Sequence, residues 1–544
     1  MPTTADAVRH YNQGNRDAAR AACEQILAGG STDNDARLLL AILLIEDGDA
    51  ARGLSLLELI VASAPGNARA RHAFGKALAR LGRTGEAIEQ LERAIALQPA
   101  NIDAYLDLGG VHLRCRDAKA AECVLRQAHR AAPQHPAVLS NLGSVLAAHG
   151  EAAEAIRILR QAVVASPQAA PARYNLGLAL KNAGRIEEAI AQYRAAIALK
   201  PDYVDAQHNL GNALLDAGNT SEAVQAYEAA TQVRRRPGAA PPGVDVLAKI
   251  GPSKLRHDIE QLRYLIEHGR LSPDQNSVVA DYEAALATLP ANMKEPTSTL
   301  LPADLRARLT PVYNRMVFRP PAESESGGAV SAQLDAPAIE ADYRRNAPGI
   351  IFVDGFLTAE ALASLRRFCL ESTVWFESRY ANGYLGAFLD DGFCCPLLLQ
   401  IADELRRTLP GIFGRHTLRK LWAFKYDARL SGIPMHADFA AINVNFWVTP
   451  DDANLDPDGG GMTVWDKEAP LSWDFAKYNN DQEALRRFLA DSQARSIEIP
   501  HRQNRVVIFN SNLIHETASL RFRDGYENRR INITMLYGKR GELP

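Results

Sequence analysis

Cysteine is scarce in this chain, and its spacing excludes two classes of protein. Six cysteines occur among 544 residues, and none of them forms a Cys-x-x-Cys pair. A disulfide framework needs many cysteines in a short secreted chain, and a structural zinc site commonly needs closely spaced thiolates. The sequence therefore indicates neither, and buried free thiols are expected.

The chain also lacks a large excess of charge, a leader segment and a long apolar run. Its formal net charge is −3, so no general electrostatic attraction draws it to nucleic acid or to an anionic membrane. The first residues lack the basic start and apolar core of a secretory signal, and no later run is long and uncharged enough to span a bilayer. A cytoplasmic protein is predicted, with neither nucleic acid nor a membrane as its partner.

What the chain does contain is an internal repeat of 34 residues in its first two-fifths. Proline and glycine each recur at that interval, the proline ending one helix and the glycine permitting close helix packing. The positions are Pro65, Pro99, Pro133, Pro167 and Pro201, together with Gly75, Gly109, Gly143, Gly177 and Gly211. Apolar residues in each unit follow helical periodicity, which predicts helix-turn-helix pairs. The units resemble tetratricopeptide repeats, and the resemblance implies an all-α solenoid of five to six repeats over residues 1–235.

A ladder of asparagines runs through the same repeats. Asn141, Asn175 and Asn209 each stand directly before a Leu-Gly pair, 34 residues apart. A carboxamide donates and accepts hydrogen bonds, so it can pair with the backbone of an extended peptide. A similar ladder in the repeats of O-GlcNAc transferase implies peptide binding here. The alternative is that these amides hydrogen-bond within or between the repeats.

Beyond the repeats the sequence predicts a connector and then a domain with a different secondary structure. Residues 236–335 begin with a run of proline and glycine, which ends the helical pattern. An apolar stripe at Leu255, Ile259, Leu262 and Ile266 predicts a helix within this connector. Residues 320–336 are rich in Pro, Ser, Gly and Glu, a composition that predicts a flexible link or an exposed loop. Residues 336–544 read as a mostly β domain with flanking helices.

The clearest sign of chemistry in this β domain is His436-Ala437-Asp438. Side chains alternate along a strand, so His436 and Asp438 are expected to project to the same face. His515 follows an apolar strand at residues 505–510 and supplies a third candidate ligand. Two imidazoles and one carboxylate can cover one face of an Fe(II) ion and leave the other face open for reactants.

These motifs resemble those of the Fe(II)- and 2-oxoglutarate-dependent dioxygenases over about residues 345 to 540. The resemblance implies a double-stranded β-helix, or jelly roll, in which His436, Asp438 and His515 are the catalytic metal ligands. The strand from Arg530 to Tyr537 looks like the prolyl hydroxylase strand whose leading arginine pairs with the far carboxylate of 2-oxoglutarate. The fold class expected for the whole chain is therefore multidomain α plus β.

Arg530 suits the role of cosubstrate anchor that the resemblance implies. The planar guanidinium forms two parallel charge-assisted hydrogen bonds with a carboxylate, which orients the ligand as well as attracting it. Arg529 is expected on the opposite face of the strand, whereas Asn532 and Thr534 share the face of Arg530.

Two further residues are candidates for contact with the cosubstrate. Tyr426 lies ten residues before His436, where similar prolyl hydroxylases place a tyrosine that touches 2-oxoglutarate; core packing in an aromatic strand is the alternative. Asn443, Asn445 and Trp447 alternate after the His-x-Asp motif, and Asn445 is the favoured one of the three. Gly459-Gly460-Gly461 is expected to form a turn rather than a phosphate-binding loop.

The resemblance implies an oxygenase that uses Fe(II), 2-oxoglutarate and O2, with ascorbate in support. Asp438 favours hydroxylation over halogenation, because related halogenases have a small residue there. A peptide or protein side chain presented by the repeats is the expected substrate. Two alternatives stay open: a repeat scaffold or sensor with an inactive barrel, and a hydroxylase of a small or carrier-tethered molecule.

Overall fold

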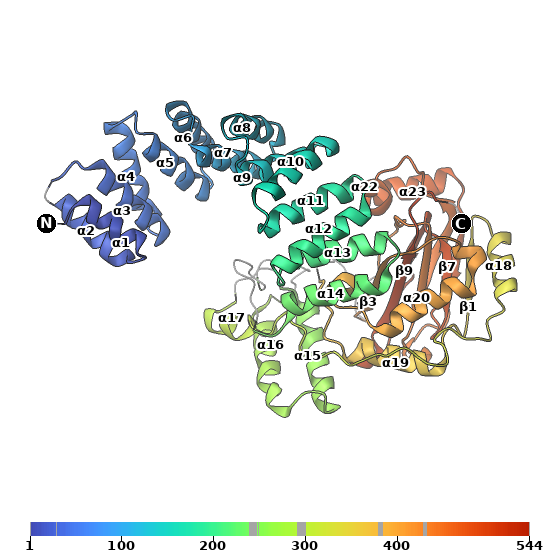
Figure 1. Cartoon of the computed structure of the whole chain (residues 1–544). Coiled ribbons are helices and arrows are strands. Elements are labelled where there is room, and N and C mark those ends of the chain that lie inside the picture. Colours follow the sequence, from blue (N-terminus) through green and yellow to red (C-terminus); the bar gives the residue numbers. More distant parts are fainter. Residues whose placement is uncertain are drawn as a thin grey trace. The chain divides into compact units, whose positions relative to one another are not determined.

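The computed structural model describes residues 2–28, 30–238, 247, 250–290, 301–378, 384–427 and 432–542. The chain forms two compact units, Met1–Lys200 and Pro201–Pro544 (Figure 1). The division falls before residue 235, where the sequence predicts the end of the solenoid. The last helix pair of the repeat region therefore belongs to the same unit as the sheets. Part of the proline and glycine run, residues 239–243, lies outside the described residues.

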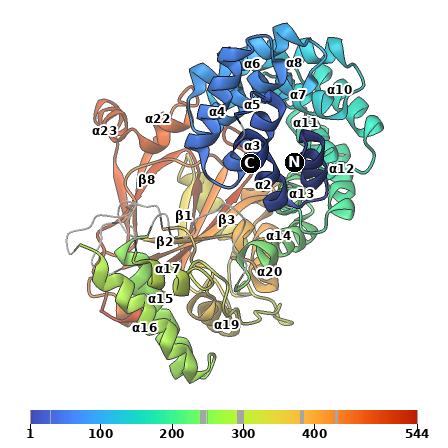
Figure 2. The same ribbon diagram turned by 90° about the vertical axis from the view of Figure 1, so that its left-hand side faces the viewer.

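The first unit consists of helices only, in the part that the structure describes. Consecutive helices pack as antiparallel pairs, each pair followed by the next (Figures 1 and 2). The helices are α1 (Thr4–Asn12), α2 (Arg16–Ala28), α3 (Asn34–Glu46), α4 (Ala50–Ser63), α5 (Ala68–Arg80), α6 (Thr84–Leu97), α7 (Ile102–Arg114), α8 (Ala118–Ala131), α9 (Pro136–Ala148), α10 (Ala152–Ala165), α11 (Ala170–Asn182) and α12 (Ile186–Leu199). The predicted helix-turn-helix pairs are confirmed.

The recurring glycines explain how closely the two helices of a pair approach. A Cβ atom added to Gly75 would lie 2.7 Å from Cγ of Leu91, and one added to Gly143 would lie 2.4 Å from Cγ of Leu159. Contacts that short do not occur between real side chains. Glycine therefore permits the close crossings of α5 with α6 and of α9 with α10, whereas at Gly109 the nearest atom, Cγ of Leu125, would lie 3.2 Å away.

The second unit contains two antiparallel sheets. The larger has the strand order β1-β7-β4-β9-β3-β2, and the smaller has the order β6-β5-β8. The strands are β1 (Ile350–Val353), β2 (Leu385–Phe388), β3 (Leu418–Tyr426), β4 (Ile442–Trp447), β5 (Met462–Glu468), β6 (Ser496–Ile499), β7 (Val506–Asn510), β8 (Leu513–Thr517) and β9 (Arg530–Tyr537). The predicted β-rich region with antiparallel sheets is present.

Helices cover the unit around these sheets. They are α13 (Val204–Asp216), α14 (Thr220–Arg235), α15 (Pro252–Glu267), α16 (Asn276–Thr288), α17 (Ala303–Leu309), α18 (Ala336–Arg345), α19 (Ala359–Glu371), α20 (Pro396–Thr408), α21 (Pro410–Phe413), α22 (Phe475–Asn480) and α23 (Gln482–Asp491), with short 3-10 turns η1 (Pro273–Gln275), η2 (Leu389–Asp391), η3 (Asp451–Ala453) and η4 (Tyr526–Asn528). The predicted connector helix is present as α15. No helix of the described chain is long and apolar enough to cross a membrane.

The central strands β4 and β9 are buried along their whole length. One face of β9 packs against helices, since the Tyr537 hydroxyl donates to the Ala402 carbonyl on α20 at 3.2 Å and the Tyr537 ring lies 4.8 Å from that of Phe413. The residues on the other face, Arg530, Asn532 and Thr534, line a cavity with residues of the smaller sheet. Because neither face of β9 meets solvent, its polar residues lie in a closed interior.

Polar contacts attach α13 and α14 to β3 and to the turn η2. His208 on α13 lies 3.1 Å from Asp390, and Asp216 lies 2.6 Å from Arg419 on β3. Arg235, at the end of α14, donates from Nε to Asp391 at 3.0 Å. These contacts explain why the compact unit begins at Pro201 and not after α14.

Of the two structures that their composition predicts, residues 320–336 form the largely exposed loop, and contacts with α20 hold part of it. The Glu404 carboxylate on α20 accepts hydrogen bonds from the amides of Ala329 and Val330, each at 2.8 Å. Gln400 donates to the Glu325 carbonyl at 2.8 Å and accepts from the Glu325 amide at 2.7 Å. The side chains of Ala322, Ala329 and Val330 are buried, and α20 satisfies backbone groups of the segment and holds it in place.

Candidate metal centre

The residues of the His-x-Asp motif and His515 converge at one end of the cavity between the sheets. Their ligand atoms all lie within 4.8 Å of one another, and Nε2 of His515 is 3.5 Å from Oδ2 of Asp438. The sequence predicts that His436 lies in a regular strand, and this prediction is wrong. His436 forms a single β-bridge with His515. Backbone hydrogen bonds of 2.9 and 2.8 Å between these two residues hold the imidazoles side by side.

Each imidazole is oriented by a carbonyl of its own chain segment. Nδ1 of His436 lies 2.9 Å from the Pro434 carbonyl oxygen, and Nδ1 of His515 lies 2.9 Å from that of Leu513. A carbonyl oxygen can only accept, so both Nδ1 atoms carry the proton. The Nε2 lone pairs are then available for a metal, as in other sites where a backbone carbonyl sets the tautomer of a ligand histidine.

The electrostatics of the cluster favour a cation. Burial and the neighbouring His515 lower the pKa of His436 to about 4, so this imidazole is neutral near pH 7. Burial alone would raise the pKa of Asp438, but the two neighbouring imidazoles and the hydrogen bonds from His515 and Asn443 outweigh it and lower that pKa. A carboxylate beside a neutral imidazole is a ligand set that binds a divalent ion without first releasing protons.

A chain of amides extends from Asp438 across the larger sheet. Asn443 donates to Oδ2 of Asp438 at 2.5 Å, and Asn445 donates to Oδ1 of Asn443 at 2.6 Å. Oδ1 of Asn445 in turn accepts from Asn532 at 2.8 Å and from Thr534 at 2.7 Å. The network orients the carboxylate. Because the side-chain oxygen of Asn445 already accepts two hydrogen bonds within this network, Asn445 lines the cavity as a positioning residue.

Arg530 lies in the same cavity and is 2% exposed. Its Nε donates to the Gly460 carbonyl at 2.6 Å and its Nη2 to the Gly461 carbonyl at 2.9 Å. Its Nη1 is buried and makes no hydrogen bond with any described residue. Burial lowers the pKa of Arg530, but a guanidinium remains charged at any physiological pH. A buried cation with an unsatisfied donor in a polar cavity fits an anionic ligand.

The glycine triplet before β5 has a role that the sequence analysis does not identify. A Cβ atom on Gly461 would lie 1.9 Å from the Ile499 carbonyl oxygen. Only glycine therefore fits at position 461, where the carbonyls of Gly460 and Gly461 accept hydrogen bonds from the guanidinium of Arg530. The predicted turn is also the support of the candidate anchor.

Arg529 points away from the cavity, as strand alternation predicts. Its Nε donates to Glu260 on α15 at 2.9 Å, and its Nη2 lies 3.8 Å from Asp427. The pairing satisfies Arg529 on the outer side of β9, so the two adjacent arginines serve opposite faces of one strand.

Tyr426 both lines the cavity and packs in an aromatic cluster. Cζ of Arg530 lies 4.8 Å from the centre of the Tyr426 ring, and the Tyr426 hydroxyl is 3.4 Å from Oγ1 of Thr517. The ring centre of Tyr384 is 5.4 Å away. Trp447 does not line the cavity; its ring lies 5.5 Å from Cζ of Arg530.

The sequence analysis missed several residues of the cavity wall. Trp422 and Phe424 share the inner face of β3 with Tyr426, and Thr517 and Met462 come from the smaller sheet. The alternation of Trp422, Phe424 and Tyr426 is a signal that predicts a common face. Nothing in the sequence around Thr517 or Met462 indicates that they meet β3 and β9 across the cavity.

Comparisons with known proteins concern the helical repeats. Models described as TPR repeat and tetratricopeptide repeat match residues 11–81, 75–114, 116–170, 181–218 and 204–236. The N-terminal part of the chain is a tetratricopeptide-repeat solenoid. No curated protein matches the chain.

Three solved structures illustrate the similarity to tetratricopeptide-repeat proteins. YrrB, a TPR protein with an unusual peptide-binding site, is 23% identical with a TM-score of 0.29, covering 33% of this chain and 92% of that one. TTC0263, a thermophilic TPR protein in Thermus thermophilus, is 25% identical with a TM-score of 0.28, covering 34% and 99%. Cut9-Hcn1, an APC/C hetero-tetramer, is 16% identical with a TM-score of 0.36, covering 42% and 46%.

Two of the three ladder asparagines in the tetratricopeptide repeats make hydrogen bonds within the protein. Asn175 donates to Oγ of Ser140 in the preceding repeat at 3.0 Å, and Asn209 donates to the Asp205 carbonyl at 2.9 Å. Asn141 is exposed. These contacts correspond to the alternative of hydrogen bonds within and between repeats, while the exposed Asn141 amide is open to a ligand.

Proposed function

We propose that the second unit is an Fe(II)- and 2-oxoglutarate-dependent dioxygenase with a double-stranded β-helix fold, and that it hydroxylates a side chain of a peptide or protein. One observation carries the proposal. The three converging ligands and a buried arginine with a free donor line the same cavity. A metal triad alone is compatible with many chemistries, whereas a cationic anchor beside it suits a cosubstrate that is both a chelator and a dicarboxylate.

In this proposal His436, Asp438 and His515 hold the ferrous ion on one side only. Bound Fe(II) and 2-oxoglutarate would supply oxidative decarboxylation to succinate and carbon dioxide, coupled to hydroxylation of a substrate C–H bond by O2. Arg530 binds the far carboxylate of the cosubstrate, and Tyr426 contacts it from β3. The buried aromatic wall excludes water, and the amide chain from Asn443 keeps the carboxylate ligand oriented.

The repeats support a protein or peptide as substrate. Tetratricopeptide repeats commonly bind peptides or proteins, and the solenoid occupies the N-terminal part of this chain. The same observation favours a second candidate, a scaffold or sensor whose barrel is inactive. A small or carrier-tethered substrate is the third.

The decisive experiment measures 2-oxoglutarate turnover in the purified protein with Fe(II), ascorbate and O2. We expect succinate to form slowly even without substrate, and we expect His436→Ala to abolish it because a metal ligand is lost. His268→Ala is the matched control, since His268 is exposed on the surface. Equal succinate from the wild type and His436→Ala would favour the scaffold candidate.

A further inference from the structure

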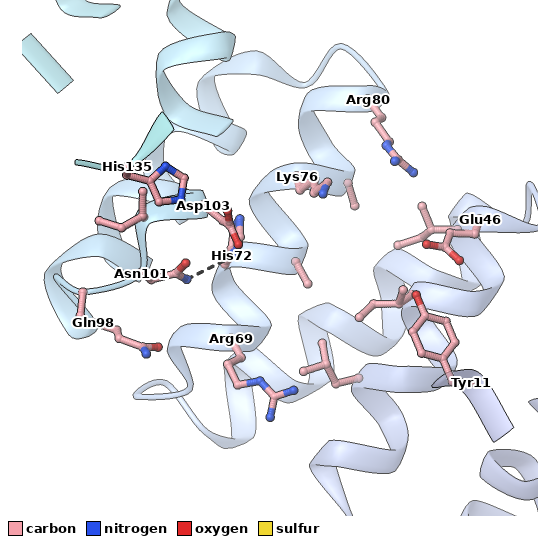
Figure 3. A pocket seen from close by; sticks show the side chains of 17 residues that line it. Tyr11, Glu46, Arg69, His72, Lys76, Arg80, Gln98, Asn101, Asp103 and His135 are labelled. Carbon is pink, nitrogen blue, oxygen red and sulfur yellow. Dashed lines mark hydrogen bonds between the residues drawn. The ribbon is translucent and has the colours of Figure 1, made fainter. Parts of the chain in front are cut away.

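The hollow along α5 in the first unit holds matched charges. Asn101 donates to Nδ1 of His72 at 3.3 Å, and Nε2 of His72 lies 2.8 Å from Asp107 (Figure 3). Three cations and three carboxylates lie in or beside this hollow: Arg69, Lys76, Arg80, Asp35, Asp103 and Asp107. These charges balance one another and need no external ion.

A cavity in the second unit contains a buried arginine whose charge is not matched in this way. The cavity lies between α15, α16 and residues 312–317, and it shares no residue with the cavity of the candidate metal centre. We name it the α15–α16 cavity. Its lining includes Lys254, Asp258, Val278, Asn314, Arg315 and Phe376.

Two donors of this arginine are left unused by the protein. Arg315 is 3% exposed, and its Nη1 donates to the Arg234 carbonyl at the end of α14, at 2.8 Å. Its Nε and Nη2 are both buried without a hydrogen bond to any described residue. These two nitrogens share one edge of the planar guanidinium, and that edge can make two parallel hydrogen bonds with a carboxylate.

Other arginines of the same unit use this edge to hold a carboxylate. Arg505 donates from Nε and Nη2 to the two oxygens of Asp354, at 2.6 and 2.9 Å. Arg235 donates from Nε to Asp391 at 3.0 Å and also from Nη2 to the second oxygen of that carboxylate. Arg315 presents the same pair of donors, but no carboxylate of a described residue accepts from them.

The other charged groups of the α15–α16 cavity are already paired. Lys254 forms an ion pair with Asp258 one helical turn further along α15, and Nδ1 of His257 lies 3.0 Å from the second oxygen of Asp258. Asp258 is thus engaged by its own helix, and Arg315 remains as the unmatched cation. Burial of an unpaired charge costs free energy, and a bound anion reduces that cost.

The size and the walls of the cavity limit the anion. The cavity measures about 30 Å³. A single water needs about 10 to 15 Å³, so there is space for a ligand of a few heavy atoms. Val278 and Phe376 give it an apolar wall. The Asn314 side-chain oxygen is also buried without a hydrogen bond to any described residue, and rotation of that amide would present its NH2 group to an anion.

We propose that the α15–α16 cavity binds a monocarboxylate of the size of acetate, whose two oxygens accept from Nε and Nη2 of Arg315 and whose methyl group meets Val278 and Phe376. Such a ligand would strengthen the contact between the end of α14 and residues 312–317, because Arg315 also holds the Arg234 carbonyl. The site lies apart from the candidate metal centre and does not depend on the proposed function.

The test is a calorimetric titration of the full chain with sodium acetate, in a buffer without other carboxylates and at constant ionic strength. We expect saturable binding of one acetate per chain. Hexanoate should bind at least about tenfold more weakly, because its chain exceeds the cavity. Absence of acetate binding would show that the cavity holds water only and would overturn the proposal. Phosphate that displaces acetate and binds more tightly would overturn the assignment to a carboxylate.

Matched variants locate the site. Arg315→Gln, checked for folding by circular dichroism, should weaken acetate binding at least about tenfold. Arg315→Lys keeps the charge but not the pair of donors, and it should also weaken binding. Arg263→Gln removes a cation from the exposed side of α15, where Arg263 pairs with Glu283, and should leave the affinity unchanged. Unchanged affinity in a folded Arg315 variant would overturn the assignment.

Two further measurements separate this site from the second buried arginine and from the oxygenase. Arg530→Gln should retain acetate binding, and its loss there would place the ligand in the other cavity and overturn the proposal. Acetate should raise the melting temperature of the wild type but not that of Arg315→Gln. The titration contains neither iron nor 2-oxoglutarate, so acetate binding without succinate formation in the turnover assay would support this site and refute the oxygenase.

Discussion

Arg530 is buried against two backbone carbonyls, and its remaining nitrogen, Nη1, is buried without a hydrogen bond to any described residue. An unsatisfied buried donor costs free energy, about 1 to 3 kcal/mol for a neutral group and more for a charged one. The fold keeps it there with glycines that no other residue can replace. Such a residue is better explained by a ligand than by stability.

Replacement of the two adjacent arginines should separate binding from stability. We expect Arg530→Ala to raise the concentration of 2-oxoglutarate needed for half-maximal succinate formation by at least about tenfold. Arg529→Ala should leave that concentration unchanged and lower the melting temperature, because the ion pairs of Arg529 with Glu260 and Asp427 are lost. A larger increase in the 2-oxoglutarate requirement for Arg529→Ala than for Arg530→Ala would contradict the conclusion that Arg530 faces the cavity.

His501 gives a pH dependence that does not involve the metal ligands. Its Nε2 lies 3.1 Å from the Thr449 carbonyl, and its Nδ1 is buried without a hydrogen bond to any described residue. Burial, and then the charge of Arg530, lowers the pKa of His501 to about 3. Protonation would place a second cation beside the guanidinium.

The sign of the effect follows from this lowered pKa. The unfolded imidazole binds a proton near its ordinary pKa of about 6.5 and the folded one does not, so this stabilisation is present above that pH and is lost as the pH falls towards 3. When the pH is lowered from about 7 to about 5, the free energy of unfolding measured by urea titration should fall for the wild type. For His501→Gln it should fall by about 2 kcal/mol less. The exposed His268→Gln should behave as the wild type, and identical slopes for all three proteins would contradict the assignment.

At the scale of the elements, the helix pairs of the solenoid depend on small residues at their crossings. Gly143 on α9 faces Leu159 on α10, with no room for a Cβ atom. Gly85 on α6 is also helical, but nothing lies within 4 Å of an added Cβ atom there. Replacement of glycine by alanine should therefore lower the free energy of unfolding at position 143 and raise it at position 85.

We expect Gly143→Ala to destabilise the protein by about 1 to 3 kcal/mol, because the added methyl overpacks the crossing. Gly85→Ala should stabilise it by about 0.5 to 1 kcal/mol, since alanine loses less backbone entropy in a helix. Thermal unfolding followed by circular dichroism measures both. Destabilisation by both substitutions would show that the repeats do not tolerate a methyl group even at an open helical position.

The connector helix α15 is a part of the β unit rather than a spacer. Gln261 donates to the carbonyls of Leu370 and Ser372 at 3.0 and 2.9 Å, and Glu260 pairs with Arg529 behind the strand that carries Arg530. The apolar stripe of the sequence predicts the helix itself. Its docking could not be predicted, because the partners lie about a hundred residues or more away in the chain.

At the scale of the whole molecule, the boundary between the compact units cuts through the repeats. The polar contacts of His208, Asp216 and Arg235 attach α13 and α14 to the β unit. We expect a fragment of residues 201–544 to fold cooperatively. A fragment of residues 237–544 should unfold at a lower temperature or aggregate, because Asp390, Asp391 and the apolar surface beneath them lose their cover.

Size-exclusion chromatography and thermal unfolding of the two fragments test this expectation. The loss of several partly buried ion pairs and one packed helix pair is expected to lower the melting temperature by several degrees at least, about 2 to 4 °C for each kcal/mol lost. Equal melting temperatures would place the boundary after α14, where the sequence alone predicts it.

The sequence by itself determines the features that rest on local periodicity. The 34-residue recurrence of Gly75 and its equivalents determines the helix pairs, and the alternation of side chains determines that Arg529 and Arg530 face opposite ways. The tertiary structure alone decides that Gly460 and Gly461 hold Arg530, that Glu404 holds residues 329–330, and that the last repeat joins the β unit. These contacts join groups far apart in the chain, and no local pattern specifies which distant backbone group a buried side chain will meet.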